Sequence, residues 1–167
     1  MAKTIYLCGF MGCGKTTIGV KLSKMMGRSF VDMDDYIEKK HHLTIPQIFA
    51  QFGEQTFRQY ETEAIRELSH QGNLVVATGG GAMTIEQNGT LAKQNGIVLF
   101  LDAPFEDCYH RIAGDSNRPN AHSRTKEELL ELYQTRYPLY QKNSSYTIDA
   151  SDSPLMIANR ILQLYNR

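Results

Sequence analysis

Gly9-Phe10-Met11-Gly12-Cys13-Gly14-Lys15-Thr16 is the stretch that decides the fold, and it matches the pattern G-x-x-x-x-G-K-[ST] at every fixed position. In this pattern the glycines let consecutive backbone N–H groups curl round phosphate oxygens at the positive end of a helix. Lys15 can reach the β- and γ-phosphates of a nucleotide, and the Thr16 hydroxyl can ligate Mg²⁺. The alternative is a glycine-rich turn without a ligand. Cys13 stands at a variable position, where a small side chain that fits is the simpler interpretation.

The sequence on both sides of this loop predicts alternating strands and helices. Five short runs are continuously apolar, as expected for parallel strands buried on both faces: Thr4–Cys8, Phe30–Asp32, Leu74–Thr78, Ile97–Leu101 and Tyr146–Asp149. The patterns between them predict helices over Lys15–Met26, Asp35–His41, Ile45–His70, Ile85–Asn95, Phe105–Ile112, Lys126–Lys142 and Pro154–Tyr165. Strands that alternate with helices predict an α/β fold with a parallel sheet.

Length and composition exclude several classes of protein. The chain has 167 residues and no linker-like segment, so residues 1–167 are predicted to form a single domain. Its 18 basic and 18 acidic side chains give no net charge, which argues against binding of nucleic acid or of a membrane surface through bulk charge. No apolar run approaches the roughly 20 residues of a membrane-spanning helix. The absence of a heptad or an apolar interface stripe predicts a monomer.

The cysteines and the N-terminus predict a cytoplasmic protein. The three cysteines show no paired spacing and fit reduced thiols: Cys8, Cys13 and Cys108. They form no metal-ligand spacing with the histidines, so a structural zinc site is not expected. The apolar run at the N-terminus is broken by Gly9 and carries a single cation, which does not fit a signal peptide.

A carboxylate that helps to hold Mg²⁺ is expected near the phosphate-binding loop, and two segments could supply it. One apolar run ends at Asp102, but this residue is predicted to cap the helix that begins near Pro104. Asp32 and Asp34 are the better candidates, because they follow the second strand at the carboxyl edge of the sheet, where α/β proteins bind ligands. One acid could face the metal and the other an acceptor substrate, although Asp34 or Asp35 could simply cap the following helix.

Further motifs narrow the class of protein. Phe57-Arg58-Gln59-Tyr60-Glu61 lies in the long second-helix region, and Gly79-Gly80-Gly81 follows the third strand. Arg111 and Arg118-Pro119 flank a polar loop, and Arg136-Tyr137-Pro138-Leu139-Tyr140 ends a late helix. Together with the phosphate-binding loop and the aspartate pair, and in this order, these segments resemble the shikimate kinase family over roughly residues 5 to 154. The resemblance implies a three-layer α-β-α fold with a five-stranded parallel sheet of order 2-3-1-4-5 and a lid loop.

The resemblance also implies an activity. Such enzymes transfer the γ-phosphoryl group of ATP to the 3-hydroxyl of shikimate, in the chorismate pathway to aromatic amino acids, and they use Mg²⁺. ATP and shikimate are then the partners of this chain. Residues 33–62 would form the acceptor-binding helices and residues 113–125 the lid.

The resemblance assigns roles to individual residues. The nucleotide would contact Gly12, Cys13, Gly14, Lys15, Thr16, Thr17, Arg111, Arg118, Ser153 and Pro154. The metal would be held by Thr16 and, through water, by Asp32. Shikimate would contact Asp34, Arg58, Gly80, Gly81 and Arg136, with both arginines on its carboxylate. Lys15, Asp34 and Arg118 would be the catalytic residues.

Plainer interpretations of these residues remain open from the sequence. Arg58 has Glu54 and Glu61 at helical spacing and could belong to a surface salt-bridge ladder. Arg136, near the end of a predicted helix, could simply complement the helix dipole. The chain could also be another small-molecule kinase, for gluconate or a nucleoside monophosphate, or a nucleotide-binding regulator with no acceptor substrate.

Overall fold

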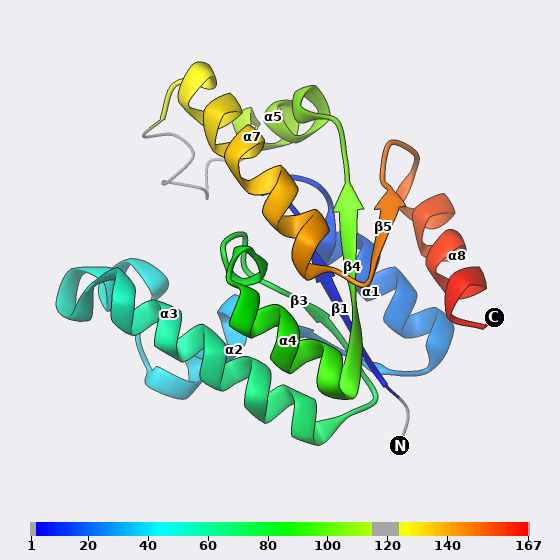
Figure 1. Cartoon of the computed structure of the whole chain (residues 1–167), viewed down its shortest axis with the longest axis horizontal. Coiled ribbons are helices and arrows are strands. Elements are labelled where there is room, and N and C mark those ends of the chain that lie inside the picture. Colours follow the sequence, from blue (N-terminus) through cyan, green and yellow to red (C-terminus); the bar gives the residue numbers. More distant parts are fainter. Residues whose placement is uncertain (1–2, 115–123, 167) are drawn as a thin grey trace.

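A parallel sheet of five strands forms the middle layer of the protein (Figure 1). The computed structural model describes residues 3–114 and 124–166. The strands are β1 (Thr4–Cys8), β2 (Ser29–Asp32), β3 (Leu74–Ala77), β4 (Gly96–Asp102) and β5 (Tyr146–Asp149). Their order is β2-β3-β1-β4-β5 and every neighbouring pair is parallel, which confirms the expected class and strand order.

Helices cover both faces of the sheet. They are α1 (Lys15–Met26), α2 (Met33–His41), α3 (Ile45–Gln71), α4 (Glu86–Asn95), α5 (Phe105–Ala113), α7 (Lys126–Asn143) and α8 (Pro154–Tyr165), with a short 3₁₀ helix η1 at Ala82–Thr84. In Figure 1, α4 and α7 lie in front of the sheet and α1 lies behind it, where α1 packs on α8. None of the helices in the described part of the chain has the length and apolarity needed to cross a membrane.

Burial follows the position of each strand in the sheet. Every residue of β1 and β3 is buried, as expected for strands covered on both faces. The edge strands differ from that expectation: β2 is at most half-buried, and β5 has only Ile148 buried. An edge strand has one neighbour and less helix above and below it, so an apolar run alone does not predict complete burial.

Two helix caps differ from the sequence predictions. The carboxylate of Asp32 accepts hydrogen bonds from the backbone N–H groups of Asp34 (3.0 Å) and Asp35 (3.2 Å), so Asp32 is the cap and α2 begins two residues earlier than predicted. The prediction that Asp102 caps α5 is also wrong. The capping position is Pro104, and the carboxylate of Asp102 instead accepts a hydrogen bond of 2.6 Å from the hydroxyl of Tyr137.

The long helix α3 is two helical segments joined at Gly53. Its backbone there has φ 87° and ψ 172°, which is not helical and favours glycine. The first segment starts with a capping box, in which Thr44 and Gln47 each satisfy a backbone N–H of the other. The break lets this segment leave the axis of α3 and carry Phe49 to the site described below.

Gly96, at the start of β4, offers a test of the sheet packing. A Cβ at this position would collide with the carbonyl oxygen of Thr4 and lie 3.1 Å from that of Ala92. Because both are backbone atoms, Gly96→Ala should lower the free energy of unfolding by about 1–3 kcal/mol. Gly114→Ala is the matched control, since the nearest atom to its Cβ is 3.6 Å away, and it should change stability by less than about 0.5 kcal/mol. Urea unfolding measures both, and equal stabilities would contradict the predicted collision.

Candidate active site

The phosphate-binding loop joins β1 to α1 and has the backbone that its glycines predict. Gly9, Gly12 and Gly14 have φ of 148°, 80° and 102°, a region that other residues rarely adopt. A Cβ on Gly12 would lie 2.6 Å from the carbonyl oxygen of Cys108 in α5, so the loop also packs closely on its neighbour. The helix α1 then begins at Lys15 and directs its positive end toward the loop.

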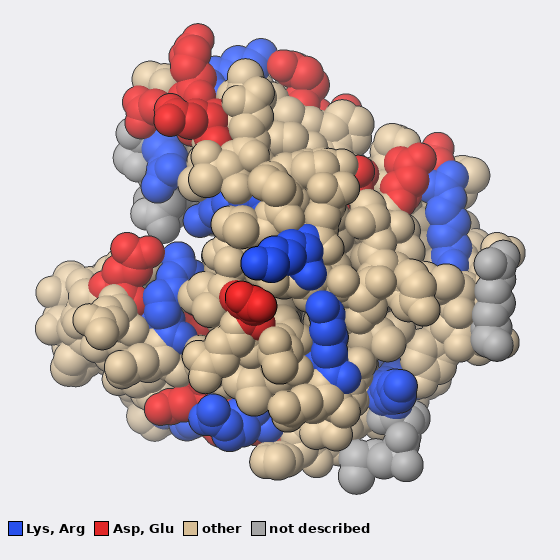
Figure 2. Space-filling model, viewed as in Figure 1, with Lys and Arg blue, Asp and Glu red and all other residues tan. Residues whose placement is uncertain are grey.

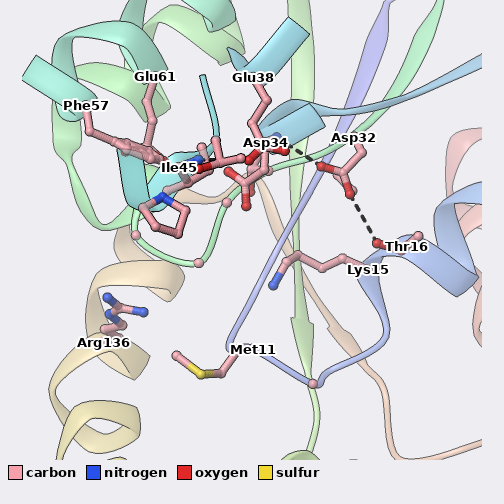
Figure 3. A pocket seen from close by; sticks show the side chains of 18 of the residues that line it. Met11, Lys15, Thr16, Asp32, Asp34, Glu38, Ile45, Phe57, Glu61 and Arg136 are labelled. Carbon is pink, nitrogen blue, oxygen red and sulfur yellow. Dashed lines mark hydrogen bonds between the residues drawn. The ribbon is translucent and has the colours of Figure 1, made fainter. Parts of the chain in front are cut away.

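Lys15 lines the cavity beside this loop, whereas Cys13 does not. The Lys15 ammonium donates hydrogen bonds to the carbonyl oxygens of Gly9 (2.6 Å) and Phe10 (3.2 Å), and its side chain faces the cavity (Figure 3). Cys13 is buried beneath the loop and is not among the residues that line the cavity. The structure therefore fits the simpler interpretation, in which Cys13 packs the loop.

Thr16 and Asp32 place two oxygen ligands side by side. The Thr16 hydroxyl lies 3.5 Å from Oδ2 of Asp32, although the two residues come from different elements (Figure 3). The other carboxylate oxygen of Asp32 caps α2 and is fixed by it. Mg²⁺ in proteins commonly takes one or two such oxygens and completes its shell with water and phosphate oxygens. The pair fits that ion.

Asp34 is a carboxylate that faces the cavity without a partner. It lies in the first turn of α2, and its Oδ1 is buried with no hydrogen-bond partner among the described residues. Burial, followed by the charge of Asp32, raises the pKa of Asp34 to about 6, against the opposing charge of Lys15. At neutral pH the group is mostly ionised and can accept a hydrogen bond from a substrate hydroxyl.

A second carboxylate, Glu61, shares the space over Gly79. A Cβ on Gly79 would lie 2.9 Å from Oδ1 of Asp34 and 3.0 Å from Oε2 of Glu61, so a side chain there would displace both acids. Glu61 is only 1% exposed and pairs with Arg58 at 2.6 Å. Burial raises the pKa of Glu61 to about 7, although the Arg58 charge lowers it.

The two arginines lie on the next two glycines. A Cβ on Gly80 would be 3.3 Å from Nη1 of Arg136, and one on Gly81 would be 2.5 Å from Nη1 of Arg58. Arg58 does pair with Glu54 and Glu61, but the second of these is buried, so the ladder is not confined to the surface. The helix-dipole interpretation of Arg136 is wrong, because α7 continues to residue 143 and Lys142 is the basic residue of its last turn.

These groups line one cavity of about 880 Å³. The cavity lies between the phosphate-binding loop, α2, the start of α3, α7 and the loop of residues 79–81, called the glycine loop below (Figure 3). In the space-filling view, basic side chains border the hollow between the lobe at the start of α3 and the body of the protein (Figure 2). The predicted site residues that line it are Gly12, Gly14, Lys15, Thr16, Thr17, Asp32, Asp34, Arg58, Gly80, Gly81, Arg111 and Arg136.

The remaining predicted site residues either do not line this cavity or lie outside the described residues. Ser153 caps α8 and Pro154 is its first residue, and neither lines the cavity. Arg118 and most of the predicted lid lie in residues 115–123, outside the described part of the chain. Arg111 does reach the loop, where it donates a hydrogen bond of 2.9 Å to the carbonyl oxygen of Gly12.

The sequence interpretation missed several lining residues. They are Met11, Glu38, Thr44, Ile45, Pro46, Phe49, Phe57, Glu61, Ala77, Thr78 and Gly79, of which Met11, Phe57, Glu61 and Gly79 stand in the motifs quoted above. Glu38 follows Asp34 by one helical turn, and its carboxylate accepts a hydrogen bond of 2.8 Å from the N–H of Ile45. Only the spacing from Asp34 could have indicated Glu38, because helix residues four apart share a face.

Comparison with known proteins identifies the family. The family model for shikimate kinase matches residues 11–166. The chain belongs to the shikimate kinase family. It is 42% identical to shikimate kinase from Psychrobacter cryohalolentis over 98% of this chain and 89% of that one. It is 44% identical to the enzyme from Acinetobacter baumannii over 96% and 90%.

Solved structures of the family have the same fold. The structure of shikimate kinase from Acinetobacter baumannii in complex with shikimate matches with a TM-score of 0.88 and 42% identity, and covers 98% of this chain and 93% of that one. The structure from Aquifex aeolicus matches with a TM-score of 0.84 and 35% identity, over 96% and 94%. The family resemblance and the expected fold are therefore confirmed.

The raised pKa of Asp34 predicts how stability depends on pH. A folded state that raises a carboxyl pKa from 3.8 to about 6 binds more protons than the unfolded state in that range, so its stability falls as pH rises through it. Asp34→Asn removes this effect. At pH 8 the free energy of unfolding of the variant should exceed that of the wild type by about 1–2 kcal/mol. This is less than the whole pKa shift would give, because residual contact with solvent weakens the effect.

The difference should vanish near pH 4, where the wild-type carboxyl is protonated. Asp35→Asn is the control: burial and the charges of Asp32 and Glu38 raise the pKa of Asp35 too, but its carboxyl is exposed, so the change in stability should stay below about 0.5 kcal/mol. Urea unfolding at both pH values measures the effect. If the difference in free energy of unfolding between Asp34→Asn and the wild type did not depend on pH, ionisation of Asp34 would not destabilise the folded state.

Proposed function

We propose that the cavity between the phosphate-binding loop, α2, α3 and α7 is where this chain carries out the reaction of its family. As a shikimate kinase, the chain phosphorylates shikimate with ATP in the pathway to aromatic amino acids. The observation that carries the proposed site is the approach of two guanidinium groups to Gly80 and Gly81, in the same cavity as Lys15. A substrate with a carboxylate and several hydroxyls suits paired arginines beside carboxylate acceptors.

The family assignment decides between the alternatives that the sequence left open. An acceptor such as gluconate or a nucleoside monophosphate does not fit the family, and a regulator without an acceptor would leave the arginine pair unused. The relative from Acinetobacter baumannii that has been solved in complex with shikimate supports shikimate as the acceptor. Residues 1–167 as one domain, a monomeric state and a cytoplasmic location stay predictions.

The nucleotide half of the site is proposed to lie on the loop. Backbone N–H groups of residues 12–17 surround the phosphates, and Lys15 neutralises charge on the transferring group. Arg111 is proposed to lie against the adenine, and Ser153 and Pro154 to border it. Arg118 is proposed to reach the phosphates from the lid.

Mg²⁺ is proposed to bind with ATP. Thr16 would be its direct protein ligand, and Asp32 would hold it through water. When bound, such an ion neutralises phosphate charge in the transition state. The chain contributes the fixed hydroxyl and carboxylate, because the α2 cap holds Asp32 in place.

The acceptor half is proposed to orient the 3-hydroxyl of shikimate. Arg58 and Arg136 bind the carboxylate at one end, and Gly80 and Gly81 lie against the ring. Asp34 accepts a hydrogen bond from the hydroxyl and aligns it with the γ-phosphoryl group. Phosphoryl transfer passes through a loose transition state, so Asp34 need not be a strong base, and a carboxylate with a pKa of about 6 suffices.

The arginine pair tests the proposed acceptor site. Removing one partner of a buried charge pair typically costs about 2–5 kcal/mol, so Arg136→Ala should raise the KM for shikimate more than about tenfold. The Kd for ATP should not change. Arg58→Lys should act in the same direction, and it keeps a cation beside the buried Glu61. A coupled ADP-release assay with shikimate measures both variants.

Arg66→Ala is the matched control, because Arg66 is exposed on the same helix as Arg58 and does not line the cavity. It should leave both constants unchanged. A wild-type protein that releases ADP equally fast without shikimate would overturn the proposed site. Unchanged KM values in the Arg136 and Arg58 variants would assign the carboxylate to other residues.

The proposed role of Asp32 in holding Mg²⁺ can be tested separately. Asp32→Asn keeps a good helix cap but removes the charge, so the Mg²⁺ concentration for half-maximal activity should rise several-fold. Asp102→Asn should leave that concentration unchanged, because the Asp102 carboxylate binds Tyr137. Titration of activity with Mg²⁺ at saturating ATP compares them. If Asp102→Asn raised that concentration and Asp32→Asn did not, Asp102 would be the carboxylate that holds Mg²⁺.

A further inference from the structure

We propose that Tyr137 is a positioning residue for the acceptor site: its hydroxyl, anchored on Asp102, fixes the turn of α7 that presents Arg136 to shikimate. The inference rests on the proposed role of Arg136 in binding the substrate carboxylate. Tyr137 itself does not line the cavity and is not expected to touch either substrate. Tyr137 acts by fixing the direction in which the side chain of Arg136 points.

The anchor joins a helix to the rigid sheet. The Tyr137 hydroxyl donates a hydrogen bond of 2.6 Å to Oδ2 of Asp102, the last residue of β4. The ring of Tyr137 packs edge-on against Phe100 of the same strand, with 5.3 Å between ring centroids. Figure 1 shows α7, in yellow and orange, running beside β4, with which it is in contact. Hydrogen bonds to a charged acceptor are among the stronger ones in proteins.

A proline interrupts the backbone hydrogen bonding of α7 two residues after Arg136. Pro138 stands inside the helix and has no N–H, so the carbonyl of Gln134 lacks its usual helical partner. A proline inside a helix also favours a kink at the preceding turn. Arg136 lies on that turn, and a long side chain converts a small rotation of its backbone into a large displacement of the guanidinium. Contacts outside the backbone must therefore fix its direction.

Two other tyrosines of α7 hold neighbouring parts of the structure. The Tyr133 hydroxyl donates to the carbonyl oxygen of Ala103 at 2.8 Å, and the Tyr140 hydroxyl donates to the carbonyl oxygen of Gly80. Tyr140 thus holds the loop against which Arg136 lies. Tyr137 is the anchor next to Arg136 in the chain, and its partner is a carboxylate rather than a carbonyl.

The Tyr137 hydroxyl remains a donor over the whole range of an activity assay. The hydrogen bond to Asp102, followed by burial, raises the pKa of Tyr137 to about 12. Its contribution to the site should therefore be the same at pH 6.5 and pH 8.5, unlike the contributions of Asp34 and Glu61.

Tyr137→Phe removes the hydroxyl and keeps the ring on Phe100. We expect the KM for shikimate to rise about three- to tenfold, with kcat changed less than about twofold and the Kd for ATP unchanged. Tyr133→Phe is the matched control, because it removes a hydroxyl from the same helix without touching the Asp102 anchor, and it should leave the KM unchanged. A KM that rises equally in both variants would indicate general loosening of α7 and overturn the inference.

Variants of Asp102 and Arg136 separate positioning from a purely structural effect. Asp102→Asn keeps an acceptor oxygen and should restore most of the affinity that Asp102→Ala loses. In the Arg136→Ala background, Tyr137→Phe should add no further rise in KM, whereas a structural effect would add in both backgrounds. An unchanged KM in Tyr137→Phe, beside a raised KM in Arg136→Ala, overturns this inference alone. An unchanged KM in Arg136→Ala overturns the proposed acceptor site and this inference with it.

Discussion

The site depends on three consecutive positions that carry no side chain. Gly79 leaves room for the carboxylates of Asp34 and Glu61, and the next two glycines leave room for two guanidinium groups. A single methyl group at Gly79 or Gly81 would come within 3.0 Å of these charged atoms. Four charged side chains from three helices meet over one strand end because the loop there offers only backbone.

The charged side chains of this cluster contribute little to the stability of the fold. Glu61 is buried and paired with Arg58, an arrangement in which the cost of removing both charges from water offsets most of their attraction. Asp34 has a buried oxygen that finds no partner in the described part of the chain, and its pKa is raised. A folded protein keeps such groups where their unsatisfied capacity is used by a ligand. A substrate hydroxyl at Asp34 and a carboxylate at Arg136 would be suitable partners for these groups.

The proposed nucleotide half of the site could be predicted from the sequence because it is built from one contiguous motif. Eight residues specify the glycine conformations, the lysine and the start of α1, and the strand before them places the loop at the carboxyl edge of the sheet. The alternation of strands and helices predicted the fold class, while the strand order came from the family resemblance. Helix starts were less predictable, since Asp32 and not its acidic neighbours caps α2.

The acceptor half is built from residues far apart in the sequence, and local patterns describe it poorly. Glu61 has the spacing of a surface ion pair with Arg58, and only the packing of the glycine loop over α3 makes it buried. Asp102 has the sequence setting of a helix cap, yet its carboxylate is used by a tyrosine 35 positions along the chain. Tertiary contacts of this kind decide the role of a polar residue after the elements are in place. The family resemblance named the residues that are proposed to face the substrate, and the structure places them around the cavity. The residues that hold them in place, such as Tyr137, become visible only once the helices have been packed on the sheet.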